Sequence, residues 1–190
     1  MAFSIGRVVI YPGFVALLCA SAYFGSFRLL AALLLAAAVH ELGHVTAAWC
    51  LGHRLDRLKL TALGAELTLE DGGTDSFFQD LVLSLSGPGA NLLLGAVLAV
   101  WSQTPLLLGA NLLLACFNLL PVVPLDGGYA LFALLSWLMP LEWADRLTAL
   151  ISRVFSLSVA LFGMVFLLQP GGRPWLLLVG LWLTTASFRP

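Results

Sequence analysis

The sequence has little charge, and what charge it has is nearly balanced. Charged residues make up 10% of its 190 residues and hydrophobic residues 61%, against roughly 25% and 45–50% in an ordinary soluble domain. The formal net charge of -1 provides neither a basic surface for nucleic acid nor an acidic tail. This composition is typical of a membrane protein, and we expect a cell-membrane location, a lipid bilayer around the chain and no nucleic acid partner.

Cysteine is also scarce, which excludes a disulfide framework. Cys19, Cys50 and Cys116 stand singly in apolar stretches, without a CxxC pair. We interpret them as small core residues. No internal repeat or low-complexity tract is present, so the chemistry of the protein must come from a small number of particular side chains.

Long apolar runs, in contrast, are abundant. A helix needs about 20 mostly apolar residues to cross a bilayer, and such runs predict transmembrane helices at about 8–27, 29–51, 77–101, 105–121, 150–169 and 174–188. The first run contains Tyr11-Pro12-Gly13 and precedes further spans, so we expect a retained helix and not a cleaved signal peptide. The predicted fold is a single all-α, multi-pass membrane domain over residues 1–190, with about six transmembrane helices.

Charged residues are concentrated in segment 52–76, between the second and third predicted helices. Stretches 58–61 and 66–70 alternate apolar and polar residues, which predicts a short membrane-associated β-hairpin or edge strand; an unstructured interfacial loop is the alternative. Of the nine Lys and Arg residues, only Arg28 and Arg173 fall on the side of the membrane opposite the termini and the two long loops. Because cytoplasmic loops are rich in Lys and Arg, we expect both termini in the cytoplasm.

Three ionisable residues interrupt the second apolar run. His40 and His44 are four residues apart, so on a helix they point the same way and can bind one metal ion, with Glu41 beside them. This is the HExxH pattern, in which two histidines bind zinc and the glutamate acts as general base. Ionisable side chains are costly at membrane depth and indicate a function. The alternative is that they only hydrogen-bond to neighbouring helices.

Asp126 is the candidate for a third ligand, since a catalytic zinc site normally has three from the protein. It follows an apolar run, where Pro121 and Pro124 prevent a regular helix and Gly127-Gly128 permit sharp turns. Irregular backbone is tolerated at membrane depth only where protein buries it or it lines a wet cavity. The alternative is an interfacial aspartate that caps the next helix.

Two asparagines stand in apolar surroundings and need hydrogen-bond partners. Asn118 lies eight residues before Asp126, and Asn91 follows a Gly-Pro-Gly break. Either could orient the metal-binding loop or a substrate carbonyl, or could make a structural hydrogen bond between helices. His53 lies at the polar end of its apolar run, and we interpret it as interfacial.

The order of these motifs resembles the site-2 protease family of intramembrane zinc metalloproteases. His40-Glu41-Leu42-Gly43-His44 is similar to the family's HExxH motif, Asn118 to Gly128 to its NxxPxxxLDG-type motif, and Ser86-Gly87-Pro88-Gly89-Ala90-Asn91 to its Gly-Pro-containing segment. The motifs lie within a catalytic core of about 29–128, flanked by the helices at 8–27, 150–169 and 174–188. The subgroup typified by the stage IV sporulation protease is the most similar, and we expect its CBS domain to be absent here.

The resemblance implies a zinc metalloendopeptidase that cuts a peptide bond in or near a transmembrane segment. His40, His44 and Asp126 would bind Zn2+, and Glu41 would act as general base on zinc-activated water. The implied substrate is a membrane-associated protein such as a pro-sigma or anti-sigma factor, reached through a cytoplasmic opening; a regulatory membrane partner is compatible with this. The alternatives are a membrane metal-ion transporter or metal-binding protein, and a catalytically inactive adaptor.

Overall fold

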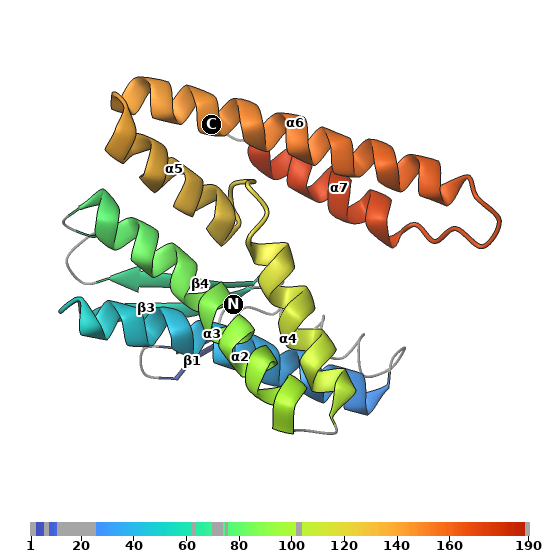
Figure 1. Ribbon diagram of the computed structural model, residues 1–190, viewed down its shortest axis with the longest axis horizontal. Coiled ribbons are helices and arrows are strands. Elements are labelled where there is room, and N and C mark those ends of the chain that lie inside the picture. Colours follow the sequence, from blue (N-terminus) through green and yellow to red (C-terminus); the bar gives the residue numbers. More distant parts are fainter. Residues whose placement is uncertain are drawn as a thin grey trace. The chain divides into compact units, whose positions relative to one another are not determined.

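The structure, a computed structural model, describes residues 3–5, 8–10, 26–61, 64–69, 74, 76–101 and 104–188. Most of these residues are helical (Figure 1). In chain order the elements are β1 (Phe3–Ile5), β2 (Val8–Ile10), α2 (Phe27–Cys50), β3 (Leu55–Thr61), β4 (Gly64–Leu69), α3 (Phe77–Trp101), α4 (Pro105–Asn118), α5 (Asp126–Leu138), α6 (Leu141–Leu167) and α7 (Trp175–Ser187).

The elements form two compact units. The first comprises the described residues up to Gln79 together with Ser86–Cys116, and thus holds the strands, α2, most of α3 and most of α4. The second comprises Asp80–Leu85 and the described residues from Phe117 onward, and thus holds α5, α6 and α7. The single membrane-embedded domain expected over residues 1–190 stays a prediction.

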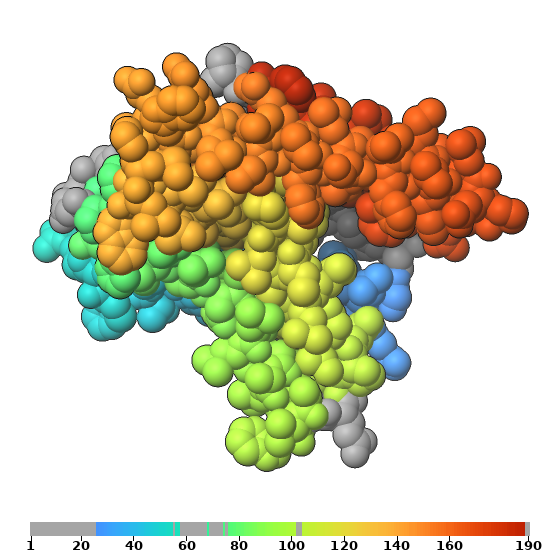
Figure 2. Space-filling view, turned by 45° about the horizontal axis from the view of Figure 1, so that its top comes forward, coloured from blue at the N-terminus to red at the C-terminus, as the bar shows by residue number. Residues whose placement is uncertain are grey.

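Within the described residues, three helices are long and apolar enough to cross a membrane: α2, α3 and α6. The apolar helices α4 and α7 are shorter, with 14 and 13 residues. Large apolar side chains such as Leu93 and Leu161 stand more than half exposed, and α6, drawn in orange, shows its side chains at the surface in Figure 2. Exposed apolar surface on long helices is what contact with lipid favours, so the chain is a membrane protein.

Several helix boundaries differ from the predicted ones. Residues 8–10 form strand β2, so no helix begins at residue 8, and residues 11–25 of that predicted span lie outside the described ranges. Helix α4 ends at Asn118, before Pro121, because proline cannot continue a helix. Helix α6 begins at Leu141, directly after Pro140, and not near residue 150. Its first turns carry charged residues, which a search for apolar runs excludes. The predicted count of six transmembrane helices stays a prediction.

The four strands form one sheet in the order β1-β2-β3-β4. Strands β1 and β2 are antiparallel, β2 runs parallel to β3 with Val9 opposite Lys59, and β3 pairs antiparallel with β4 with Leu60 opposite Ala65. Strands β3 and β4 lie in the segment where alternation predicts a hairpin or edge strand. The association of this segment with a membrane surface stays a prediction.

In the first unit, α2 packs closely against α3 and α4. Ala32 and Ala36 of α2 are buried with Ala110 of α4, and the small side chains let the helices approach. Between α2 and α3 the approach is closer still, since a Cβ on Gly43 would lie only 2.5 Å from the carbonyl oxygen of Ser86. The chain segment around His40 and His44 is therefore fixed against two neighbouring helices.

In the second unit, α6 and α7 lie side by side and hold the loop that precedes α5 (Figure 1). The Ser156 and Ser187 hydroxyls share a 3.0 Å hydrogen bond between the two helices. The N–H of Val123 donates to the buried Ser152 Oγ of α6 at 3.2 Å, and Val122 packs against Leu183 of α7 in a buried cluster. The backbone that leads into Asp126 is thus anchored on both helices.

Candidate metal centre

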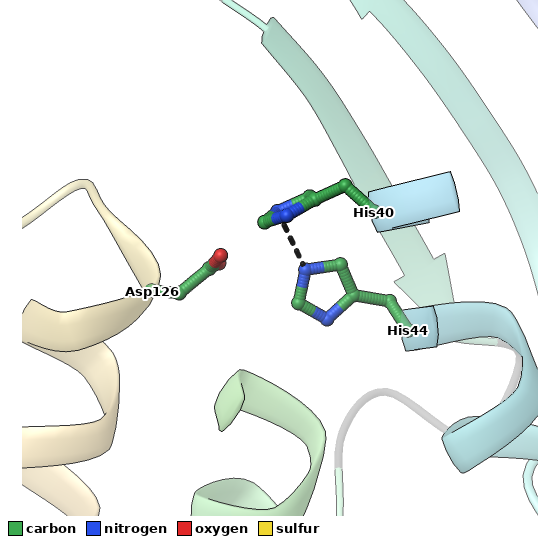
Figure 3. Close-up of side chains that lie close together, drawn as sticks. All are labelled: His40, His44 and Asp126. Carbon is green, nitrogen blue, oxygen red and sulfur yellow. Dashed lines mark hydrogen bonds between the residues drawn. The ribbon is translucent and has the colours of Figure 1, made fainter. Parts of the chain in front are cut away.

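His40 and His44 stand one turn apart on α2, as their spacing predicts. His40 is 6% exposed and His44 is half-buried. Their rings meet edge to face, with centroids 4.8 Å apart, and the two Nε2 atoms are 3.2 Å apart (Figure 3). The Nε2 atoms of the two rings therefore lie close enough together to bind one metal ion.

This spacing fits a shared zinc ion. Histidine nitrogens bind zinc at about 2.0–2.1 Å in tetrahedral geometry, so two such nitrogens on one ion lie about 3.3–3.4 Å apart. The observed 3.2 Å between the Nε2 atoms of His40 and His44 is close to that value. Imidazole is also among the preferred ligands of zinc. The donor type and its geometry both suit the metal.

Each imidazole has a hydrogen-bond partner at its other nitrogen. Nδ1 of His40 is 2.8 Å from the Asn91 Oδ1 of α3, in buried surroundings. Nδ1 of His44 is 3.2 Å from the Ser86 Oγ, one turn earlier on α3. Metal-binding histidines generally donate from the nitrogen that does not bind the metal, which fixes the orientation of the ring. Both rings have, at Nδ1, a partner that can accept such a hydrogen bond.

The His44 ring occupies space that only a glycine leaves open. A Cβ on Gly87 would collide with Nε2 and with the two neighbouring ring carbons of His44, whereas a Cβ on Gly89 would meet nothing within 4 Å. The Gly-Pro-Gly segment that sequence analysis noted therefore has a defined task at its first glycine, which is to make room for the imidazole.

Asp126 is the first residue of α5 and is half-buried. The preceding loop folds closely over the start of this helix, since a Cβ on Gly127 would collide with the Leu119 carbonyl and a Cβ on Gly128 with the Val123 backbone. The loop and the two glycines thus fix the backbone at the start of α5, which carries Asp126. Within the described residues, His40, His44 and Asp126 form a group that could hold a metal ion (Figure 3).

The remaining predicted site residues fall at different places. Glu41 is half-buried on α2, next to His40, and Asn118 is the last residue of α4; their functional roles stay predictions. Asn91 is fully buried and makes hydrogen bonds between helices, one of them to His40. His53 is 7% exposed, and its Nε2 lies 3.2 Å from the Gln79 Oε1.

Sequence analysis did not single out Asn111. It is fully buried in α4, and its Oδ1 accepts a 2.8 Å hydrogen bond from the Asn91 Nδ2. The signal that drew attention to Asn91, a polar side chain in an apolar run, applies equally to Asn111. The pairing of the two required tertiary structure.

Comparison with known proteins provides relatives but no matching family model. The chain is 30% identical over 163 residues to stage IV sporulation protein FB of Bacillus subtilis (strain 168), a match that covers 82% of this chain and 56% of that protein. It is 30% identical over 138 residues to a zinc metalloprotease of Methanocaldococcus jannaschii, which covers 67% of this chain and 40% of the relative. The chain thus spans about half the length of these curated relatives, or less.

The fold is similar to that of a solved site-2 protease. The solved structure of a site-2 protease from Methanocaldococcus jannaschii matches 98% of this chain and 93% of its own, with a TM-score of 0.69 at 24% identity. Among the sequence matches, the alignment with stage IV sporulation protein FB covers 82% of this chain. By sequence and by fold, the chain belongs to the site-2 protease family.

Proposed function

We propose that the chain is a zinc metalloendopeptidase that hydrolyses a peptide bond in or near a transmembrane segment of a membrane-associated protein. The observation that carries this proposal is the His40–His44 pair, with Nε2 atoms 3.2 Å apart. The hydrogen bonds of their Nδ1 atoms to Asn91 and Ser86 support it, because they leave both Nε2 atoms directed to a common point. Asp126 is the proposed third ligand, which leaves a fourth position for water or substrate.

The proposed mechanism assigns proton transfer to Glu41. A bound zinc ion would lower the pKa of water to about 7 and would polarise the carbonyl to be cut. Glu41 follows His40 directly on α2, one position round the helix from the histidine pair. We propose that it accepts the proton from the attacking water and returns it to the leaving amine. Helix α2, which carries both histidines, is long and apolar enough to cross a membrane, and this supports chemistry within the bilayer. We propose that water reaches the site from the cytoplasmic side and that both termini lie on that side.

A zinc and cleavage assay on purified protein in detergent tests the function. The wild type is expected to contain about one zinc per chain and to cut members of a panel of single-span model substrates. Asp126→Ala is expected to weaken zinc binding at least tenfold and to stop cleavage, because a three-ligand site becomes a two-ligand site. Zinc content measured by atomic absorption and cleavage followed by mass spectrometry report both properties.

The same assay separates the proposal from its competitors. A wild type that binds zinc and carries it across proteoliposome membranes, yet cuts no substrate of the panel, would favour a transporter. A wild type that binds neither zinc nor another divalent metal would favour an inactive adaptor. Unchanged zinc affinity in Asp126→Ala would show that Asp126 is not a zinc ligand. The assignment of the two histidines would be unaffected.

We further propose that the edge strand β4 binds the substrate by strand addition. Helical substrates hide their peptide bonds in hydrogen bonds, so the segment to be cut must be unwound and held. Strand β4 pairs only with β3 within the described sheet, which leaves one side of it for another strand. The substrate class that fits is a membrane protein, such as a pro-sigma or anti-sigma factor, that can supply an extended segment.

Proline scanning tests the role of β4. A proline at successive positions from Ala65 to Thr68 is expected to reduce cleavage about tenfold or more at alternate positions, because every second N–H points away from β3 toward the added strand. Zinc content should remain at the wild-type level. Cleavage that is equal at all four positions and equal to wild type would exclude strand addition at β4.

A further inference from the structure

A chain of buried polar side chains runs from α4 through α3 to the first histidine on α2. We propose that Asn111, together with the Ala36 carbonyl, orients Asn91 and thereby determines which ring nitrogen of His40 carries the proton, which keeps the lone pair of His40 on Nε2 for the metal. Asn111 does not contact the metal ligands in any described hydrogen bond; it is a positioning residue. The inference rests on the proposed function only in that His40 is a zinc ligand.

The chain of hydrogen bonds is short and well formed. Asn91 and Asn111 are both 0% exposed. The Asn91 Nδ2 donates to the Ala36 carbonyl oxygen of α2 and to the Asn111 Oδ1, each at 2.8 Å, and the Asn111 Nδ2 donates to the Leu107 carbonyl oxygen at 2.9 Å. The Asn91 Oδ1 lies 2.8 Å from the Nδ1 of His40.

The backbone carbonyls of Ala36 and Leu107 determine which group donates in each of these hydrogen bonds. A carbonyl oxygen only accepts hydrogen bonds, so the Asn111 amide must turn its NH2 group toward Leu107 and its oxygen toward Asn91. Asn91 must then turn its NH2 group toward Asn111 and toward the Ala36 carbonyl, which leaves its oxygen facing His40. Rotating either amide by a half-turn would place two acceptors or two donors against each other, so the orientation follows from the network.

The direction of the chain selects the tautomer of His40. An amide oxygen can only accept, so the Nδ1 of His40 must donate to the Asn91 Oδ1. A neutral imidazole with its proton on Nδ1 has its lone pair on Nε2, the atom that lies 3.2 Å from the Nε2 of His44. Without this constraint a neutral histidine in water distributes its proton between both nitrogens, and the form protonated on Nε2 cannot bind zinc through that atom.

Solution NMR of metal-free protein with 15N-labelled histidine tests the inference. The chain has three histidines, so signals can be assigned with His44→Ala and His53→Gln variants. In the wild type, at a pH where the His40 ring is neutral, its proton is expected on Nδ1. In Asn111→Leu, a variant of similar volume, only the Ala36 carbonyl still orients Asn91; a mixture of tautomers and a zinc affinity about tenfold weaker are expected.

Two further variants separate a directional effect from a general loss of packing. Asn111→Asp retains an oxygen that accepts from the Asn91 Nδ2, and in its protonated form it also has an O–H that can donate to the Leu107 carbonyl, so the wild-type tautomer of His40 is expected to persist when the new side chain is neutral. Gln79→Leu removes another amide of the same unit, the partner of His53, and should leave the signals of His40 unchanged. For both variants the expected result is the wild-type tautomer of His40. A general loss of packing would not favour one tautomer over the other.

The inference is overturned if metal-free wild-type His40 carries its proton on Nε2, or if Asn111→Leu keeps both the wild-type tautomer and the wild-type zinc affinity. If Asn111→Leu fails to fold, the tautomer of the wild type and of Asn111→Asp still decides. None of these measurements needs a substrate or turnover. A protein that cuts no substrate would therefore refute the proposed protease function while leaving this result intact.

Discussion

Glu41→Gln is expected to abolish cleavage of every substrate while about one zinc per chain stays bound. Glutamine has the size and shape of glutamate but cannot accept a proton, and loss of a general base typically reduces a rate by about 10²–10⁴-fold. The ring nitrogens of His40 and His44 and their hydrogen bonds to Asn91 and Ser86 do not involve Glu41. Single-turnover cleavage and zinc content, measured on the same preparation, check both halves of this prediction.

A second substitution on the same helix is the control for Glu41→Gln. Thr46→Val removes an exposed hydroxyl that bonds back to the Leu42 carbonyl at 2.6 Å, and it should leave cleavage and zinc content at wild-type levels. Cleavage by Glu41→Gln within tenfold of wild type would remove Glu41 from the role of base. Loss of zinc in Glu41→Gln would instead make Glu41 part of the metal site, and the metal-transport hypothesis would gain support.

The histidine pair could be predicted from sequence because its geometry is local. On a regular helix residues four apart share a face, and α2 is helical from Phe27 to Cys50, so the spacing of His40 and His44 was enough to predict that their side chains lie on one face. The family could also be recognised from the sequence, because each motif that carries the resemblance is a short stretch of the chain. The comparison with known proteins confirmed the family. The roles of the individual site residues remain predictions that the variants above test.

The supporting contacts could not be predicted, because they join residues far apart in the chain. Asn91 bonds to Ala36, 55 residues earlier, and to Asn111, 20 residues later. The sequence of an apolar helix with one asparagine does not show which neighbouring helix will provide the hydrogen-bond partner of that asparagine. The same holds for the parallel pairing of Val9 with Lys59, which local alternation of residues does not encode.

The helix boundaries show a different limit. An apolar run identifies the part of a helix that suits lipid, but helical structure continues where polar side chains begin. Helix α6 illustrates this, since it begins at Leu141 and includes Glu142, Asp145 and Arg146 before its apolar part. Proline is the more reliable signal for such an end, as Pro140 before α6 and Pro121 after α4 show.

Gly87→Ala is expected to reduce cleavage about a hundredfold or more, although alanine is the better helix former. Alanine in a helix interior is favoured over glycine by about 1 kcal/mol, so helix propensity alone predicts a more stable protein. The added Cβ, however, collides with the Nε2 end of the His44 ring. The ring must move, and its displacement changes the 3.2 Å contacts that it makes with the Ser86 Oγ and with the Nε2 of His40. A displacement of about 1 Å in a reacting constellation can cost about 10²-fold in rate.

Gly89→Ala is the matched control, because Gly89 lies on the same helix on the other side of Pro88, and a Cβ there meets nothing within 4 Å. Gly89→Ala also gains helix propensity, without the steric restriction that Pro88 places on residue 87, and should retain wild-type zinc content and cleavage. Zinc titration by calorimetry and thermal unfolding of the two variants separate the effects: Gly87→Ala should lose zinc affinity without losing stability in the metal-free form. Equal zinc affinity in the two alanine variants would mean that the added Cβ does not displace a zinc-binding Nε2 of His44, and the role assigned to Gly87 would then fail, whatever the outcome for Glu41.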